Sequence, residues 1–232
     1  MKTIGLLGGM SWESTTIYYQ ALNRSVRDVL GGLHSAKILL HSVDFAEIAA
    51  LQSSGDWDTA GRVLAEAAAG LEQAGADMIL ICTNTMHKVA PAIEAAISVP
   101  LLHITDSTAL EAKRRGFRKL GLLGSAFTME QAFYRDRMKE LHDIEIIVPD
   151  EADRQLVHRV IFDELCCGQV TDSSRKAYLD ICEKLRAAGA DAVILGCTEI
   201  GLLIDERHTD VPLLDSTHLH ATAAIDLATR GD

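Results

Sequence analysis

The stretch Ala74-Gly-Ala-Asp-Met-Ile-Leu-Ile-Cys-Thr-Asn-Thr85 recurs 114 residues later as Ala188-Gly-Ala-Asp-Ala-Val-Ile-Leu-Gly-Cys-Thr-Glu199. In each copy, a Gly that follows a helical segment precedes a short apolar run, and a polar cluster with a thiol comes next. A Gly at the end of a helical period stops the helix, and a short apolar run between turn signals is typical of a buried strand. The stretch therefore predicts, twice, a helix end, a turn, a buried strand and a polar loop.

Two further echoes keep the same order and nearly the same spacing. Ile4-Gly-Leu-Leu-Gly8 returns as Leu120-Gly-Leu-Leu-Gly124, which is 116 residues later. Val99-Pro-Leu-Leu102 returns as Val211-Pro-Leu-Leu214, which is 112 residues later. Three echoes in one order predict two similar domains in a single chain.

Runs rich in Ile, Leu and Val alternate with helical periods along both halves, which predicts βαβ units and parallel sheets. The expected fold class is α/β, with two pseudo-symmetric domains, each a mostly parallel sheet flanked by helices. We place the domains at residues 1–105 and 106–215, and we expect a C-terminal helix at 216–232 to pack on the first. Strands are expected near 3–7, 37–40, 78–81, 101–103, 120–123, 144–148, 192–195 and 213–214. Helices are expected near 14–30, 45–51, 58–74, 88–96, 106–115, 129–141, 151–165, 173–187 and 220–229.

Composition narrows the class of protein. The net charge is −11 without a local cluster of Lys or Arg, which argues against a nucleic-acid or anionic-membrane partner. The apolar runs are only strand-length, so we expect no membrane span. Five cysteines without metal-type spacing or a secretory leader indicate free thiols in a reducing cytoplasm. His218 and His220 have metal-like spacing but no neighbouring ligand cluster, and we interpret them as surface or cap histidines, so that no metal site is expected.

Polar clusters follow the expected strands, where open α/β sheets bind their ligands. The clusters are Gly8-Gly9-Met10-Ser11, Cys82-Thr83-Asn84-Thr85, Gly124-Ser125 and Cys197-Thr198-Glu199. Each of these loops leads into a helix, whose first N–H groups suit an anion such as a carboxylate. The sequence therefore predicts a site at the strand ends that takes a small anionic molecule.

Cys197 is the thiol with the strongest case for function. It follows Gly196, where the backbone can turn or approach a ligand closely, and it is placed by the repeat at a strand end. A thiol has a reference pKa of ~8.5, which falls near a helix N-terminus, so a thiolate here would act as a base or nucleophile. We interpret Cys166, Cys167 and Cys182, which lie in helical stretches, as packing residues.

In the first half, the repeat indicates Thr83 as the counterpart of Cys197, with Cys82 as the alternative. Aligned without a gap, Thr83 falls opposite Cys197 and Cys82 opposite Gly196, whereas a slip of one residue pairs the two cysteines. Adjacent residues of an extended segment face opposite sides, so only one of the two is expected to face a ligand.

Several motifs resemble the aspartate/glutamate racemase family, whose members work without pyridoxal phosphate. Cys82-Thr83-Asn84-Thr85-Met86-His87 resembles its first signature, and Val193-Ile-Leu-Gly-Cys-Thr-Glu-Ile200 resembles its second. Gly5-Leu-Leu-Gly-Gly-Met10 and the following Ser-Trp-Glu-Ser also resemble it, so that the likeness covers essentially the whole chain.

The resemblance implies two α/β domains with the substrate in the cleft between them, and a homodimer. It also implies that one group removes the Cα proton while a second returns a proton from the opposite face, without a metal or other cofactor. Six residues would bind the substrate by this resemblance: Met10, Gln52, Asn84, Thr85, Thr198 and Glu199.

The chain departs from the family in two places. Commonly a Cys directly precedes the Asn of the first signature, whereas Thr83 stands here. Many relatives carry a basic residue where Cys166-Cys167-Gly168 stands, so that an acidic substrate side chain is less strongly implied.

These observations predict an isomerase, a cofactor-independent racemase of aspartate, glutamate or a broader set of amino acids, with Cys197 and Thr83 (or Cys82) as its acid/base pair. A one-thiol relative such as an arylmalonate decarboxylase or maleate isomerase is the rival enzyme. A non-catalytic binding module for small molecules is the third interpretation.

Overall fold

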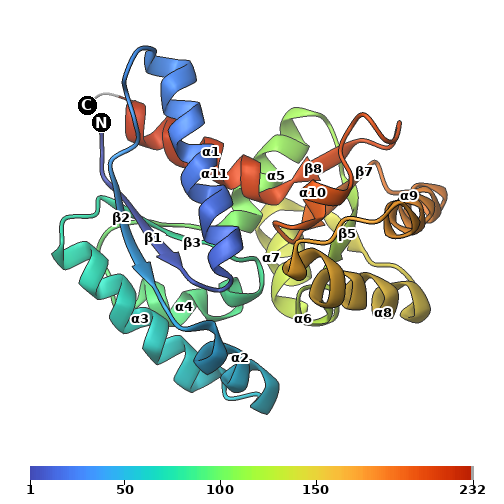
Figure 1. Cartoon of the computed structure of the whole chain (residues 1–232), viewed down its shortest axis with the longest axis horizontal. Helices are drawn as coiled ribbons and strands as arrows, with labels where there is room; N and C mark the ends of the chain where they lie inside the picture. Colours follow the sequence, from blue (N-terminus) through green and yellow to red (C-terminus); the bar gives the residue numbers. More distant parts are fainter. Residues whose placement is uncertain (231–232) are drawn as a thin grey trace. The chain divides into compact units, whose positions relative to one another are not determined.

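The computed structural model describes residues 1–230 of the chain, so the end of the expected helix at 231–232 lies outside the described residues. The chain divides into two compact units, one of Met1–Ile104 with the segment from His220 onward, and one of Thr105–Leu219. Each unit holds a four-stranded parallel sheet with helices beside it (Figure 1). The predicted α/β class with two parallel sheets is confirmed. The domain bounds 1–105 and 106–215 stay a prediction.

The first unit has the strand order β2-β1-β3-β4. Its strands are β1 (Ile4–Gly8), β2 (Ile38–Ser42), β3 (Met78–Ile81) and β4 (Leu101–Leu102). Its helical segments are α1 (Trp12–Leu30), α2 (Phe45–Ser54), α3 (Trp57–Gln73), the 3₁₀ turn η1 (Thr85–Val89), α4 (Ala90–Glu94) and the part of α11 (Ser216–Thr229) that follows Leu219.

Alternation along β3 divides the core of the first unit between the two faces of the sheet. Met78, Leu80 and Cys82 pack with apolar side chains of α1 and α11. Ile79 and Ile81 pack instead with side chains of α2 and α3. Because successive side chains of a strand point to opposite faces, the residue at each position is committed to one of these two cores.

The second unit repeats the arrangement with the strand order β6-β5-β7-β8. Its strands are β5 (Lys119–Gly124), β6 (Glu145–Ile147), β7 (Ala192–Gly196) and β8 (Leu213–Asp215). Its helical segments are α5 (Ile104–Arg114), α6 (Ala126–Glu130), α7 (Ala132–His142), α8 (Glu151–Arg159), the π turn η2 (Val160–Glu164), the 3₁₀ turn η3 (Leu165–Cys167), α9 (Asp172–Ala187), α10 (Ile200–Leu203) and the start of α11.

Some helices differ from the expected ones. The helix expected at 129–141 begins earlier and is broken, because Ser125 caps α6 through its hydroxyl and Gln131 is extended (φ −82°, ψ 148°). The helix expected at 151–165 changes to π and then 3₁₀ geometry after Arg159. The four-residue helix α10 was not expected, since a single turn carries almost no periodicity.

The central strands pair in the same register in each of the two sheets. Leu7 of β1 pairs with Ile81 of β3, and Leu123, the echo of Leu7, pairs with Leu195 of β7. The strand pairs of the two halves are therefore aligned residue for residue, and the ungapped alignment of the long repeat is also the structural one.

Gly9 follows β1 where the chain needs a left-handed backbone and has no room for a side chain. Its φ is +91°, and a Cβ built there would overlap the carbonyl oxygen of Val43, the residue after β2. Gly55, at the end of α2, has a similar φ of +76°, but no atom lies within 4 Å of its hypothetical Cβ. Because Gly9 has no side chain, the loop after β1 can lie directly against the end of β2.

We expect Gly9→Ala to destabilise the protein more than Gly55→Ala does. Gly55→Ala carries only the left-handed backbone cost, about 1–2 kcal/mol. Gly9→Ala adds the overlap with Val43, which we expect to cost about 1–3 kcal/mol more in stability. Urea unfolding of both variants would measure the difference, and equal free energies of unfolding would contradict this account of Gly9.

Candidate active site

The loop after β1 is fixed by the first turns of α1. The Gly9 amide donates to Thr15 Oγ1 at 2.8 Å, and the Thr15 hydroxyl donates to the Ser11 carbonyl at 2.8 Å. Ser11 in turn caps the helix by accepting from the Ser14 amide at 3.2 Å. Because all strands of the sheet are parallel, this loop and the one after β3 lie at the same edge, where such sheets bind ligands.

Thr83 and Cys197 hold equivalent positions in the two sheets. Ile81 and Leu195 are equivalent by register, and Thr83 and Cys197 each lie two residues further along. Both residues keep some exposed surface, although the Cys197 thiol itself is buried. Cys82 instead has no exposed surface and belongs to the apolar core beside α1 and α11. Burial raises the pKa of the Cys82 thiol far above its usual range, so the group stays protonated.

The structure gathers the other expected first-half residues around the end of β3. Asn84 is buried, and Thr85 next to it begins η1. Gln52 comes from α2, and its amide Nε2 donates to Met86 Sδ at 2.9 Å. Met10 is buried in the core that Met86 shares with side chains of α2 and α3. Gln52 thus contacts the residue that directly follows Thr85.

In the second unit, the expected residues form a hydrogen-bonded group after β7. The Cys197 thiol donates to Glu199 Oε2 at 2.9 Å, and the Glu199 side chain is 5% exposed. Thr198 is buried, and its hydroxyl accepts from Thr217 at 3.2 Å. Cys166 lies on the other side of the carboxylate, with its Sγ 4.0 Å from Glu199 Oε1.

Burial raises the pKa of the Cys197 thiol well above its usual value, and the negative charge of Glu199 raises it further. The Cys166 group adds a smaller contribution of the same sign. Cys197 is therefore a protonated thiol that donates a hydrogen bond to the Glu199 side chain. This is the opposite of the lowered thiol pKa that the sequence suggested, and it arises because the neighbouring charge is an anion.

Gly196 matters for packing between strands. A Cβ there would lie 2.8 Å from the carbonyl oxygen of Leu123 and 2.8 Å from Leu122 Cδ1, both on β5. The glycine therefore lets β7 approach β5 closely. Because Cys197 is the next residue, this main-chain contact helps to determine where its thiol lies.

We expect Glu199→Gln to speed alkylation of Cys197. Removing the charge removes one cause of the raised pKa, so the pKa falls and the thiolate fraction at a given pH rises. The measurement is the rate of iodoacetamide labelling at Cys197, by mass spectrometry from pH 7 to 10, in a Cys167→Ala background that lacks the exposed thiol. Glu206→Gln, at an exposed position, is the control. An unchanged or slower rate for Glu199→Gln would contradict the assigned cause.

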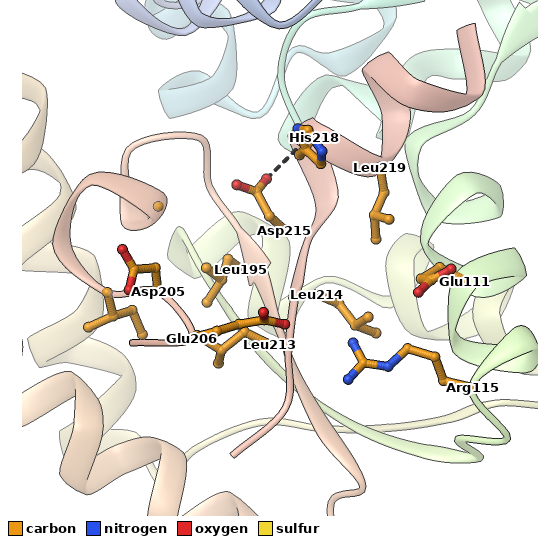
Figure 2. Close-up of a pocket in the computed structure, with 12 residues that line it drawn as sticks. Glu111, Arg115, Leu195, Asp205, Glu206, Leu213, Leu214, Asp215, His218 and Leu219 are labelled. Carbon is orange, nitrogen blue, oxygen red and sulfur yellow. Dashed lines mark hydrogen bonds between the residues drawn. The ribbon is translucent and has the colours of Figure 1, made fainter. Parts of the chain in front are cut away.

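A separate cavity of about 430 Å³ lies beside the edge strand β8. Figure 2 shows Glu111 and Arg115 of α5 across from Leu213 and Leu214. Asp215 ends the strand, where the His218 amide donates to its Oδ1 at 3.0 Å and burial raises the pKa of its carboxyl. The lining includes none of the residues predicted for the site.

Within residues 1–230, no helix is long and apolar enough to cross a membrane. In the same part of the chain, no three His, Cys, Asp or Glu side chains are grouped so that they could hold a metal ion. His220, expected at the surface or at a cap, is instead fully buried in the first unit. Its ring bonds to the Tyr18 hydroxyl and to the Leu102 carbonyl, which explains the burial.

Two contacts near the site were missed from sequence. Cys166 packs against the core of the second unit, as interpreted, and it also lies beside Glu199, a contact that its separation from Cys197 does not indicate. Ser14 stands in the Ser-Trp-Glu-Ser motif without a role assigned to it, and its hydroxyl donates to the Cys82 carbonyl at 2.8 Å. Both contacts join segments that are distant in sequence, so only the folded chain reveals them.

Comparison with known proteins assigns the chain to a family, because the model of the Asp/Glu/hydantoin racemases matches residues 7–224. The chain belongs to the Asp/Glu/hydantoin racemase family. By this membership it is a racemase, and thus an isomerase.

Individual relatives agree. A solved structure from Yersinia pestis, described as a candidate Asp/Glu racemase, is 54% identical, with a TM-score of 0.94 over 99% of this chain and 100% of that one. An aspartate racemase homologue from Pyrococcus horikoshii OT3 is 32% identical, with a TM-score of 0.88 over 99% and 100%. The broad specificity amino-acid racemase RacX of Bacillus subtilis (strain 168) is 25% identical, over 96% of each chain.

Proposed function

We propose that the protein is a cofactor-independent amino-acid racemase in which Cys197 and Thr83 exchange protons with opposite faces of the substrate Cα. The observation that carries the proposal is the equivalence of Thr83 and Cys197 in two sheets of identical register. Racemisation needs two acid/base groups that approach one carbon from opposite sides. A duplicated strand end that bears one such group in each half supports this proposal.

Thr83 is the better candidate than Cys82 for the first-half group. Cys82 is enclosed by apolar side chains of the first unit, and its raised pKa denies it a thiolate. Thr83 is partly exposed and precedes Asn84 and Thr85, which we expect to bind the substrate. A hydroxyl is a far weaker base than a thiolate, so the pair is chemically unequal.

The resting thiol of Cys197 requires a proton acceptor before it can act as a base. Glu199 Oε2 is already hydrogen-bonded to that thiol and would take its proton once the positive charge of the bound substrate ammonium offsets the Glu199 charge that raises the thiol pKa. The thiolate then removes the Cα proton of the L-enantiomer, and Thr83 supplies a proton to the other face. Thr83 regains a proton from solvent and Glu199 releases one to it, which restores the starting charges. Reversal of these steps converts the D-enantiomer.

The Cα–H is a weak acid, so the site must stabilise the enediolate that forms. Helix N-termini after the strands, with Asn84, Thr85 and Thr198, would hold the substrate carboxylate. Met10, Gln52 and Glu199 complete the expected substrate contacts. Aspartate and glutamate are the expected substrates, and a broader set is compatible with the name of the Bacillus relative.

We expect Cys197→Ala to lower the rate of racemisation by about 10²–10⁴-fold, the usual contribution of a general acid or base. Thr83→Ala should suppress inversion but keep exchange of the L-substrate Cα proton in deuterated water, because Cys197 still removes and returns it. Thr83→Cys should restore or raise inversion. Polarimetry measures inversion, and proton NMR measures exchange.

Cys82→Ala and Cys182→Ala are the matched thiol controls, and both should leave exchange and inversion near wild-type levels. If Cys82→Ala abolishes inversion while Thr83→Ala does not, Cys82 is the second group and this assignment of Thr83 is wrong. If Cys197→Ala keeps most of the rate, the mechanism is wrong.

We also expect activity without a metal or other cofactor. Dialysis against a chelator, or treatment with hydroxylamine to remove pyridoxal phosphate, should leave the rate unchanged. The proposal is overturned if activity is lost and returns on addition of a divalent metal or pyridoxal phosphate.

One observation favours a second candidate. With Cys82 enclosed in the core, Cys197 is the one thiol of the two repeated loops placed for chemistry, as in a one-thiol arylmalonate decarboxylase or maleate isomerase. Such an enzyme would not invert amino acids, and a non-catalytic binding module would not exchange their Cα protons either.

We extend the proposal to a homodimer in the cytoplasm. Five free thiols suit a reducing compartment, and the dimer is carried over from the resemblance to the family. Light scattering of the purified protein would measure its mass in solution.

A further inference from the structure

Buried side chains hold both peptide groups that flank Thr83. The Ser14 hydroxyl, from α1, donates to the Cys82 carbonyl at 2.8 Å. The His87 ring donates from Nδ1 to the Thr83 carbonyl at 2.8 Å. Ser14 and His87 are 3% and 2% exposed, so water does not compete for these bonds.

The partners of His87 fix its protonation state. A carbonyl only accepts, so Nδ1 carries a proton toward the Thr83 oxygen. The Ile104 amide only donates, and it lies 3.2 Å from Nε2, so that nitrogen must carry a lone pair. His87 is therefore a neutral imidazole with its proton on Nδ1, and it connects the end of β3 to the first residue of α5.

The rings around His87 have a different hydrogen-bond pattern. His220 donates from Nε2 to the Leu102 carbonyl at 2.9 Å and accepts from the Tyr18 hydroxyl at 2.8 Å through Nδ1. Its ring centroid is 5.7 Å from that of His87, whereas the ring of His103 is 4.5 Å away. His220 thus belongs to the same buried cluster, but its ring nitrogens bond to other groups than Thr83.

We propose that His87, together with Ser14, is a positioning residue that holds the Thr83 hydroxyl in place for proton transfer. This inference rests on the proposed function. The hydroxyl is attached to Cβ, so its position follows the orientation of the two flanking peptide groups. Proton transfer tolerates errors of only about 0.5 Å, and a 1 Å misplacement can cost about 10²-fold in rate. Because Thr83 is a weak acid/base, its proton transfer is already slow, and misplacement would slow it further.

His87→Leu removes both ring bonds, and His87→Asn keeps an N–H donor near the position of Nδ1. For His87→Leu we expect inversion to fall about 10–10²-fold, while exchange of the L-substrate Cα proton, which depends on Cys197, stays within about twofold. His87→Asn should recover most of the inversion. His220→Leu is the matched control, since it removes an equally buried ring of the same cluster that does not bond to Thr83.

Thermal unfolding separates positioning from a structural role. Both leucine variants should lower Tm, but only His87→Leu should lower the ratio of inversion to exchange. Ser14→Ala, which suits the first turn of a helix, should fold and lower that ratio as well, with Thr16→Ala at an exposed position of α1 as its control. In the wild-type protein, ¹⁵N NMR should show the Nδ1–H tautomer for one histidine, and His87→Asn should remove that signal.

Each outcome decides between the two proposals. If the wild-type protein racemises but His87→Leu and His220→Leu change the ratio equally, or if Ser14→Ala leaves it unchanged, the positioning role is overturned and the proposed function stands. If the wild-type protein neither racemises amino acids nor exchanges their Cα protons, the proposed function fails and the positioning role fails with it. An Nε2–H signal for His87 would overturn the assigned tautomer directly.

Discussion

The close contact between the two central strands of each sheet is the constraint on which the rest of the structure depends. Gly5 and Gly121 hold equivalent positions: a Cβ at Gly5 would lie 2.7 Å from Ile79 Cδ1 of the neighbouring strand, and one at Gly121 would lie 2.8 Å from Leu185 Cδ1 of α9. Neither glycine adds a side chain to these crowded positions, where β1 pairs with β3, and β5 with β7, in one common register. That register determines which residue stands at each strand end, so it selects Thr83 and Cys197 as counterparts.

Equivalent positions nevertheless have different chemical surroundings. Cys197 donates to an acidic side chain two residues away, so its proton has a nearby acceptor. Thr83 is held through its main chain by Ser14 and His87, which act on carbonyl oxygens. In the second unit the neighbouring side chain thus controls the charge of Cys197. In the first unit the neighbouring side chains control the position of Thr83. Duplication preserved the backbone plan while the side chains around it diverged.

Much of this could be predicted from the sequence, since the repeat and the apolar periodicity are properties of short segments. The parallel sheets and the thiol-bearing loops follow from such segments. The raised pKa of Cys197 does not, because it depends on burial and on how the Glu199 side chain is oriented. The burial of His220 was not predicted for a similar reason, since its partners come from distant segments. Local patterns predict elements, whereas contacts between distant segments decide how a side chain behaves.

The inequality of the two groups has a thermodynamic limit. The D and L forms of an amino acid have equal free energies, so kcat/KM must be the same in both directions whatever the chemistry of the two groups. A hydroxyl opposite a thiol can therefore only redistribute barriers between binding and proton transfer, or lower the rate in both directions together. In a site of this kind, restraint on the position of the weaker group raises the rate most. The reason is that low basicity and misplacement of that group each lower the rate. The two main-chain bonds that flank Thr83 supply restraint at the position where the chemistry is weakest.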